Sequence, residues 1–592
     1  MLRAAEPRRG RDARARRRRA TSWRGPAVAL LLAVALALTG CTTGEGPDEQ
    51  PQQSAPEQAP APEAAPAEGP DEDVAEEPTR SAPERAPAPE AVPDASAPPE
   101  GPTEPPVPDD RAEVVARTQR LLADAVRAAE DVSLAVLVTD EHGREIAAHR
   151  PDEPMLPAST LKVVTAAALL MTVGPDATFT TRVESTAPID GDGRLFGDLA
   201  LVGGGDPALA TDEYGRWVYP ARPRTPLASL ADELVELGLS HVDGDVVGMA
   251  PGFVGPTRAE GWPDRYFSSF DARYASGLTV DAGLRTILTY PEPEEDEEGA
   301  EEGEAPGEDL DPADEARLAS PDGAEQPTEE GPDPEDLGPP DVTVDHVVDP
   351  AAHAAAELIR LLEERGVTVY GEARSGDVEE PMVGRLASVE SPPMEELLRF
   401  AVQRSDNALT DGLFQAIGRI RTGEGSWSRG DRALRQVLDR LDIDHSQAVF
   451  ADGSGLSRDD RLTVRLLVDL DRHMTDGRHA QTWRSLMAVM GESGTLRERL
   501  RGTVAAGRFH GKTGTLRDVT ALSGMVTDAD GGRYHLAVVA NDAQGQGRWV
   551  ARQLMDELIL QLSADVAGCA VTVEEPDDED EPTTIQRSTI SC

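Results

Sequence analysis

The sequence predicts an α/β (α+β) fold, in which an antiparallel sheet is flanked by helices and interrupted by a large inserted region. Three observations lead to this prediction. A helix and two strands open the first ordered stretch, helical spacing dominates from Ser388 to Leu500, and strands followed by one amphipathic helix return from His510 onward. A long mixed region separates the first group from the second. This order indicates an α/β sandwich built on an antiparallel sheet.

The first elements are predicted from the spacing of apolar residues. Residues 111–130 carry apolar side chains at helical intervals, and residues 132–139 are rich in β-formers. A turn at Gly143 leads to a second short strand near Ile146. An apolar helix from Ser159 to about Thr172 follows and ends at Gly174, which is a typical helix terminator.

The later elements follow the same rules. Helical spacing is clearest at residues 394–402 and 464–474. The predicted strands cover 510–513, 521–527 and 534–541, and an amphipathic helix covers about 548–562.

Three acidic segments lack the apolar groups that a core needs. Residues 41–110 are expected to form a disordered Pro/Ala/Glu-rich tether, and residues 291–340 a disordered surface loop. A cation-binding role is the alternative for that loop. Residues 564–592 form an acidic tail, which we expect to be mobile from Glu574. The net charge of -52 argues against nucleic-acid binding through a broad basic face.

The N-terminus is typical of an export signal. A basic stretch precedes an apolar run at residues 26–38, which suits a signal peptide better than a membrane span. The run ends in Leu38-Thr39-Gly40-Cys41, which resembles a bacterial lipobox. We therefore predict a signal peptide at 1–40 and lipidation of Cys41. The chain would be anchored on the outer face of the cytoplasmic membrane, facing the cell wall. An ordinary secretory signal or an uncleaved anchor is the alternative.

The chain has three cysteines, Cys41, Cys569 and Cys592. If Cys41 is lipidated, the other two could form a disulfide that ties down the C-terminal segment. A free or intermolecular Cys592 is an equal alternative. No cluster of Cys and His has metal-ligand spacing, so we expect neither a metal site nor a cofactor.

Lysine occurs only at Lys162 and Lys512, and every other basic residue is arginine. A lysine amine can lose its proton when it is desolvated, whereas arginine stays protonated. Lys162 follows Ser159 by three positions at a predicted helix start, so the amine can reach the hydroxyl. The helix dipole favours an alkoxide there and disfavours an ammonium. This pattern predicts a serine nucleophile with a nearby base.

Two further strings carry polar groups suited to the same chemistry. Ser405-Asp406-Asn407 follows a helical stretch and supplies a hydroxyl and an amide, although such strings are also common in helix caps. Lys512-Thr513-Gly514-Thr515 lies on a predicted strand. Its ammonium and two hydroxyls beside a glycine could bind a carboxylate. A solvent-facing edge strand is the alternative.

Ser-x-x-Lys, Ser-Asp-Asn and Lys-Thr-Gly in this order are the signature of penicillin-recognising serine acyltransferases. The chain resembles the D-alanyl-D-alanine carboxypeptidase/endopeptidase family, the class C low-molecular-mass penicillin-binding proteins of the penicillin-binding protein 4 type. Three other strings share the resemblance, which covers residues 112–563: Gly203-Gly204-Gly205-Asp206-Pro207, Asp452-Gly453-Ser454-Gly455-Leu456-Ser457-Arg458 and Gly494-Thr495-Leu496.

The resemblance implies a penicillin-binding protein/β-lactamase-like transpeptidase fold. Residues 111–184 and 381–563 would form the catalytic domain, and 185–380 would be inserted domain material. Class A β-lactamases place the first two motifs far closer together.

The resemblance also implies the roles of the site residues. Ser159 would attack the D-Ala-D-Ala bond of a peptidoglycan stem peptide, and Lys162 would take its proton. Ser405, with Lys512 nearby, would pass a proton to the leaving nitrogen, and Asn407 would orient the substrate amide and Lys162. The residues implied to bind substrate are Thr513, Gly514 and Thr515.

β-Lactams would acylate the same serine. The alternatives are a β-lactamase or esterase of the same fold, and a non-catalytic cell-wall scaffold lipoprotein.

Overall fold

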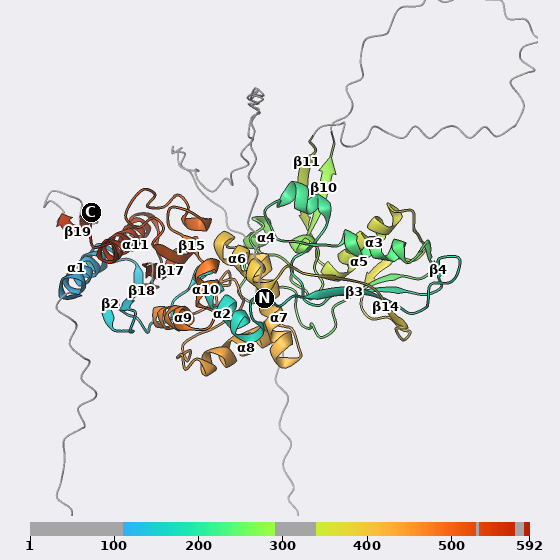
Figure 1. Cartoon of the computed structure of the whole chain (residues 1–592), viewed down its shortest axis with the longest axis horizontal. Coiled ribbons are helices and arrows are strands. Elements are labelled where there is room, and N and C mark those ends of the chain that lie inside the picture. Colours follow the sequence, from blue (N-terminus) through green and yellow to red (C-terminus); the bar gives the residue numbers. More distant parts are fainter. Residues whose placement is uncertain (1–110, 291–338, 529–531, 575–584) are drawn as a thin grey trace, which may run out of the picture. The chain divides into compact units, whose positions relative to one another are not determined.

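The computed structural model describes residues 111–290, 339–528, 532–574 and 585–592 (Figure 1). All of them belong to one compact unit, Gly101–Cys592. The predicted signal peptide, the tether and Cys41 lie outside the described residues, as does nearly all of the acidic loop. Within the described ranges, no helix combines the length and the apolar character needed to cross a membrane.

A six-stranded sheet joins the two ends of the folded chain. Its strand order is β15-β16-β17-β18-β1-β2, and every neighbouring pair is antiparallel. The strands are β1 (Ser133–Asp140), β2 (Glu145–His149), β15 (Ala488–Val489), β16 (Phe509–Leu516), β17 (Val519–Thr527) and β18 (Gly532–Asn541). Both sheet faces are covered, so β17 is buried along its whole length.

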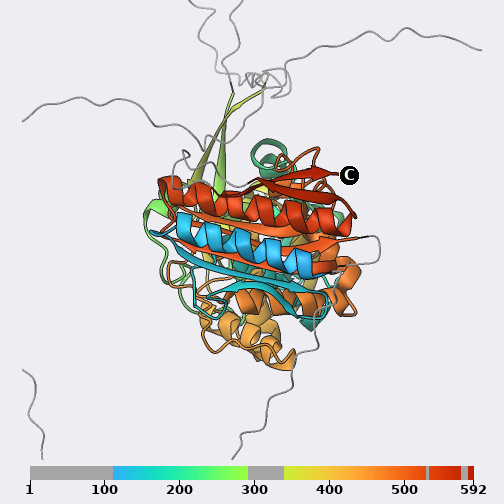
Figure 2. The same cartoon turned by 90° about the vertical axis from the view of Figure 1, so that its left-hand side faces the viewer.

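The alternation of side chains along β1 assigns its residues to two cores. Leu134, Val136 and Val138 face α1 (Ala112–Ala128) and α11 (Gly545–Val566). These two helices lie side by side over the sheet (Figure 2). Ala135 and Leu137 belong to the opposite core. Because successive strand residues point to opposite faces, one short strand serves both layers.

A layer of helices covers the second face. It consists of α2 (Lys162–Val173), α6 (Met394–Arg404), α7 (Asn407–Thr422), α8 (Trp427–Arg440), α9 (Val464–Asp476) and α10 (Ala480–Leu486). Helix α2 is apolar nearly all round, and it is buried from Lys162 to Leu170. Such a helix has to lie inside a helical layer rather than on its surface.

The inserted region has its own five-stranded sheet, in the order β13-β9-β5-β3-β14, with helices α3 and α5 packed against it (Figure 1). The first strand of this sheet in sequence is β3 and the last is β14. The sheet therefore extends slightly beyond the predicted range 185–380. The elements are β3 (Thr180–Ser185), β5 (Leu199–Val202), β9 (Val246–Met249), β13 (Ala373–Ser375), β14 (Gly384–Glu390), α3 (Ala228–Glu236) and α5 (Pro350–Glu363).

Shorter elements complete the inserted region. A three-stranded sheet has the order β12-β8-β4, and β10 pairs antiparallel with β11 on either side of the undescribed residues 291–338. The bounds are β4 (Arg194–Leu195), β6 (Leu209–Ala210), β7 (Thr225–Pro226), β8 (His241–Val242), α4 (Arg265–Ser268), β10 (Leu284–Thr289), β11 (Asp341–His346) and β12 (Thr368–Val369).

The C-terminal segment differs from the expected mobile tail. Strands β19 (Ala570–Glu574) and β20 (Arg587–Ser591) pair antiparallel and pack on α11. The Glu557 carboxylate of α11 accepts a hydrogen bond from the Ser588 backbone N–H at 3.0 Å. Ile585 is buried in the core beneath. The acidic residues 575–584, which suggested mobility, lie outside the described residues.

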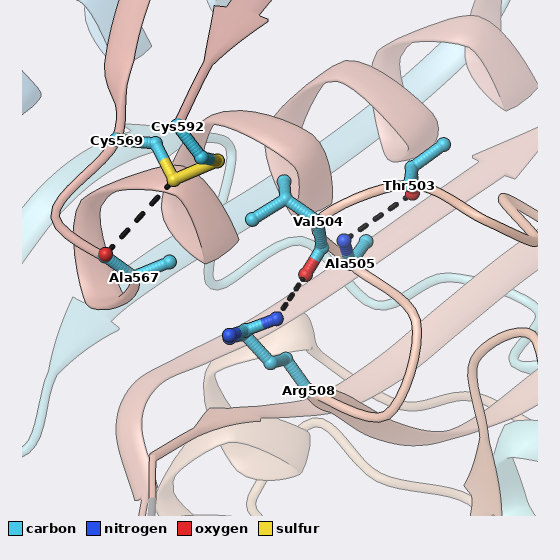
Figure 3. The surroundings of a disulfide bond; sticks show 7 residues. All are labelled: Thr503, Val504, Ala505, Arg508, Ala567, Cys569 and Cys592. Carbon is cyan, nitrogen blue, oxygen red and sulfur yellow. Dashed lines mark hydrogen bonds between the residues drawn. A yellow bond between two sulfur atoms is a disulfide. The ribbon is translucent and has the colours of Figure 1, made fainter.

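A disulfide joins Cys569 to Cys592 and closes this ribbon. Figure 3 shows it beside the loop that precedes β16, where Arg508 donates to the carbonyl oxygen of Val504 at 2.8 Å. The structure therefore decides between the two alternatives that the sequence left open for Cys592, in favour of the pair.

Candidate active site

The predicted nucleophile and base lie on consecutive turns of different helix types. A 3₁₀ turn covers Ala158–Leu161, and the α-helix begins only at Lys162. The sequence predicted one continuous helix from Ser159. Side chains three positions apart eclipse one another in a 3₁₀ turn. The Nζ atom of Lys162 accordingly lies 3.1 Å from Ser159 Oγ.

The turn that carries Ser159 is held tightly from two sides. Ala158 has a φ of 47°, in the left-handed region that costs a residue with a Cβ energy. A Cβ at Gly455 would collide with the Ala158 carbonyl oxygen, and one at Gly514 would lie 2.8 Å from the Pro157 carbonyl oxygen. Both glycines are therefore required for this close approach.

The second motif forms the kink between α6 and α7. Ser405 ends α6 in a left-handed conformation, with φ 60° and ψ 39°. Asp406 caps α7 by accepting a hydrogen bond from the Leu409 N–H at 2.9 Å, and Asn407 is the first helical residue. The side chains of Ser405 and Asn407 thereby reach the two lysines from one short segment.

Asp406 is anchored by the inserted region. Arg222 Nε donates to Asp406 Oδ2 at 3.0 Å, and both side chains are buried. Burial pushes the pKa of Asp406 upward, but the Arg222 guanidinium, the Leu409 N–H and Arg273 together outweigh it, and the net pKa is lowered. The carboxylate therefore stays charged and keeps its capping role.

The third motif lies on β16, which packs against the Ser159 turn. Lys512 is fully buried, and its Nζ donates to Ser405 Oγ at 3.0 Å and to the Thr513 carbonyl oxygen at 2.7 Å. The Thr513 hydroxyl bonds to that of Thr495 at 2.8 Å, and Thr515 is exposed at the end of the strand. Hydroxyls thus remain accessible beside two buried amines.

Lys162 has three partners, which define the direction of its lone pair. Its Nζ lies 2.7 Å from Asn407 Oδ1, 2.7 Å from the Ser454 carbonyl oxygen and 3.1 Å from Ser159 Oγ. The Asn407 amide is oriented, because its Nδ2 donates to the Asp271 carbonyl oxygen at 3.0 Å. Carbonyl oxygens can only accept, so they use both protons of a neutral amine. The lone pair then points at the Ser159 hydroxyl.

The surroundings of the two amines lower the pKa of both. Burial lowers the pKa of Lys162 to about 8, although the carboxylates of Asp411, Asp452, Asp406 and Asp460 oppose the shift. Burial, aided by the nearby Lys162, lowers the pKa of Lys512 well below its ordinary value. Two ammonium groups this close in a dry site disfavour one another.

The structure thus brings the predicted residues together in two neighbouring hydrogen-bonded groups, Ser159–Lys162–Asn407 and Ser405–Lys512, with Thr513, Gly514 and Thr515 alongside. Sequence reasoning gave no role to the Ser454 carbonyl, the Asp271 carbonyl or Thr495. The Asp452-Gly453-Ser454-Gly455 string was recognised as part of a resemblance. The glycines on both sides of Ser454 could have indicated that the backbone at this serine lies close to another segment.

Comparison with known proteins shows the family of the chain. A family model described as the D-Ala-D-Ala carboxypeptidase 3 (S13) family matches residues 116–562. The chain belongs to this family. It is 32% identical over 441 residues to the D-alanyl-D-alanine carboxypeptidase of Actinomadura sp. (strain R39), covering 70% of this chain and 78% of that relative. It is 30% identical over 472 residues to a carboxypeptidase of Mycolicibacterium smegmatis, covering 76% and 86%.

A solved structure supports the fold of this S13 carboxypeptidase. Penicillin-binding protein 4 of Haemophilus influenzae superposes with a TM-score of 0.58 at 22% identity, covering 74% of this chain and 99% of that protein. The predicted penicillin-binding-protein-like fold, the family and the enzyme class are therefore confirmed. The chain is a serine-type D-Ala-D-Ala carboxypeptidase of the cell wall.

Proposed function

We propose that this carboxypeptidase cleaves the D-Ala-D-Ala bond of peptidoglycan stem peptides through an ester on Ser159. The contacts of Lys162 Nζ, two with carbonyl-type oxygens and one with Ser159 Oγ, carry this proposal. As Ser159 Oγ bonds to the carbonyl carbon of the penultimate D-Ala, its proton passes to Lys162 Nζ. Because burial lowers its pKa to about 8, roughly a tenth of that amine is neutral at pH 7, far more than for an ordinary lysine.

Collapse of the tetrahedral intermediate breaks the peptide bond, and the leaving nitrogen needs a proton. Ser405 lies within hydrogen-bond reach of Lys512 and can deliver one from its hydroxyl. The proton that Lys162 took from Ser159 then replaces the one that Ser405 gave up, so both groups return to their starting state. Water then attacks the ester and restores the Ser159 hydroxyl. Backbone N–H groups of Ser159 and Thr515 would stabilise the oxyanion, each typically contributing about 3–4 kcal/mol to transition-state binding.

Recognition of the terminal carboxylate falls to β16. The Thr513 and Thr515 hydroxyls flank Gly514, whose missing side chain keeps the strand close to the nucleophile turn. Lys512 supplies positive charge when protonated. A β-lactam carries a carboxylate next to a strained amide and would acylate the same serine. The endopeptidase reaction would use the same centre on a cross-linked peptide.

The decisive experiment compares a fluorescent penicillin with a D-Ala-D-Ala peptide. Wild type should take a stable label and release D-Ala, whereas Ser159→Ala should do neither. Rapid drug turnover without D-Ala release would favour a β-lactamase or esterase. A folded wild type that takes no label would favour a non-catalytic cell-wall scaffold.

We further propose export of the chain and anchoring by lipid on Cys41, on the outer face of the cytoplasmic membrane. The basic stretch, the apolar run and the lipobox-like string support this location. Metabolic labelling with a tagged fatty acid should mark the full chain and not Cys41→Ala. Equal labelling of both chains would contradict anchoring at this cysteine.

A further inference from the structure

We infer that Trp262, in the inserted region, is a positioning residue for the catalytic base, acting on Lys162 through Asp452 and the Ser454 carbonyl. The inference rests on the proposed role of Lys162. It assigns the inserted region a part in the chemistry, beyond its own separate core.

The turn that presents the Ser454 carbonyl is organised by one buried carboxylate. Asp452 Oδ1 accepts from the backbone N–H groups of Ser454 at 3.0 Å and Gly455 at 2.7 Å. Asp452 Oδ2 accepts from the Ser457 N–H at 2.7 Å. With three backbone donors on one side chain, the turn has little freedom, and the Ser454 carbonyl stays 2.7 Å from Lys162 Nζ.

The fourth donor comes from outside the turn. Trp262 Nε1 donates to Asp452 Oδ2 at 2.7 Å, with both side chains buried. The indole is itself fixed, because its ring packs edge-on against Trp427, with the centroids 5.4 Å apart. A rigid donor of this kind sets the position of the carboxylate and, through it, of the turn.

The same inserted segment also fixes the other acceptor on Lys162. The Asp271 carbonyl oxygen accepts from Asn407 Nδ2 and so turns Asn407 Oδ1 toward the amine. Trp262 and Asp271 are nine positions apart in one segment. Each of the two acceptors that direct the lone pair is therefore held by a group from this segment.

The effect on protonation can be given a sign. The charged groups that act on Lys162 are those of Asp406, Asp411, Asp452, Asp460 and Lys512. The Ser454 carbonyl dipole and the charge of the Asp452 carboxylate both favour the ammonium form, and the hydrogen bonds to Asp452 hold both groups close to Lys162. Loosening them should lower the pKa of Lys162 and, at the same time, release the lone pair from its direction toward Ser159.

The matched test uses two tryptophans of one aromatic cluster. Trp262→Phe removes the donor to Asp452 and keeps most of the ring packing. Trp427→Phe makes the same change where the indole donates to the Pro256 carbonyl oxygen instead. We would measure penicillin acylation of the full-length protein from pH 6 to 10. Trp262→Phe should lower the plateau rate about tenfold, as for one lost hydrogen bond to a charged group, and move the midpoint to lower pH.

The protonation of Lys162 can be measured directly, because the chain has only two lysines. Protein labelled with ¹³Cε-lysine should give two side-chain signals, which Lys512→Arg would assign. The Lys162 signal should titrate at lower pH in Trp262→Phe than in wild type and Trp427→Phe. Asp452→Asn, which removes the charge itself, should shift it in the same direction and further.

Two outcomes would overturn the inference. Identical rate–pH profiles for Trp262→Phe and Trp427→Phe would reduce Trp262 to a packing role, as would an unchanged Lys162 titration. Failure of the wild type to be acylated would instead overturn the proposed function.

Discussion

The left-handed backbone at Ser405 allows a prediction in which stability and activity separate. Ser405 has a φ of 60° at the end of α6, where glycine is the usual residue. Its hydroxyl accepts a hydrogen bond from Lys512 Nζ at 3.0 Å. Ser405→Ala and Ser405→Gly both remove that hydroxyl, and only the glycine variant also removes the Cβ. Their difference therefore isolates the cost of the backbone conformation.

The magnitude follows from two opposing terms. A residue with a Cβ costs about 1–2 kcal/mol in the left-handed region. Glycine gives back about 0.4–1 kcal/mol, because it makes the unfolded chain more flexible. The free energy of unfolding should therefore be about 1 kcal/mol higher for Ser405→Gly than for Ser405→Ala. Relative to wild type, both variants lose the hydroxyl acceptor of a buried amine, which costs about 1–3 kcal/mol.

Urea unfolding followed by tryptophan fluorescence would compare the two variants under one condition. The glycine variant should have the higher midpoint, while penicillin acylation falls to the same low rate in both. An alanine variant as stable as the glycine variant would refute the strain argument. Clearly different acylation rates would show that the backbone, rather than the hydroxyl, carries the activity.

Three further predictions test other parts of the molecule. Penicillin acylation should rise with pH through a midpoint near 8, because burial lowers the pKa of Lys162 to about 8, and a midpoint near 10.5 would contradict this. Between pH 8 and 10.5, Lys162 binds fewer protons in the folded state than in the unfolded state. Its contribution to the free energy of unfolding should therefore rise with pH across this interval and be lost as pH falls through about 8. Arg222→Met should destabilise the protein by about 3–5 kcal/mol by leaving Asp406 buried and unpaired, and Arg222→Met with Asp406→Asn should recover part of that loss in a thermal melt. Cys569→Ser should destabilise the C-terminal ribbon by up to about 3 kcal/mol, measured by hydrogen exchange, and should leave the acylation rate nearly unchanged because the ribbon packs on α11.

The sequence predicted those parts of the site that depend on local spacing. Lys162 follows Ser159 by three positions, so their contact requires only one helical turn. The 3₁₀ geometry was not predicted, because it depends on Ala158 being held in a left-handed conformation by the segments containing Gly455 and Gly514. Such constraints arise from tertiary packing and leave no periodic pattern.

Long-range hydrogen bonds explain what else was missed. The string at Asp452 was recognised by resemblance, but its contact with Trp262 joins segments that are far apart in the chain. The C-terminal ribbon was missed for another reason. Val571, Val573 and Ile590 alternate with exposed neighbours, as strands do, but the acidic residues between the strands dominate the local composition.

The pairing of β1 with β18 has a consequence for biosynthesis. Val136 pairs with Val538, about 400 positions later, so closing this pair has a large entropic cost and depends on chain made late. The inserted sheet needs only residues up to Glu390 and can form earlier. At ordinary translation speeds β1 waits roughly 20–80 s for its partner. Throughout that interval β1 lacks its β18 partner, and the nucleophile turn remains without the strand that bears Lys512.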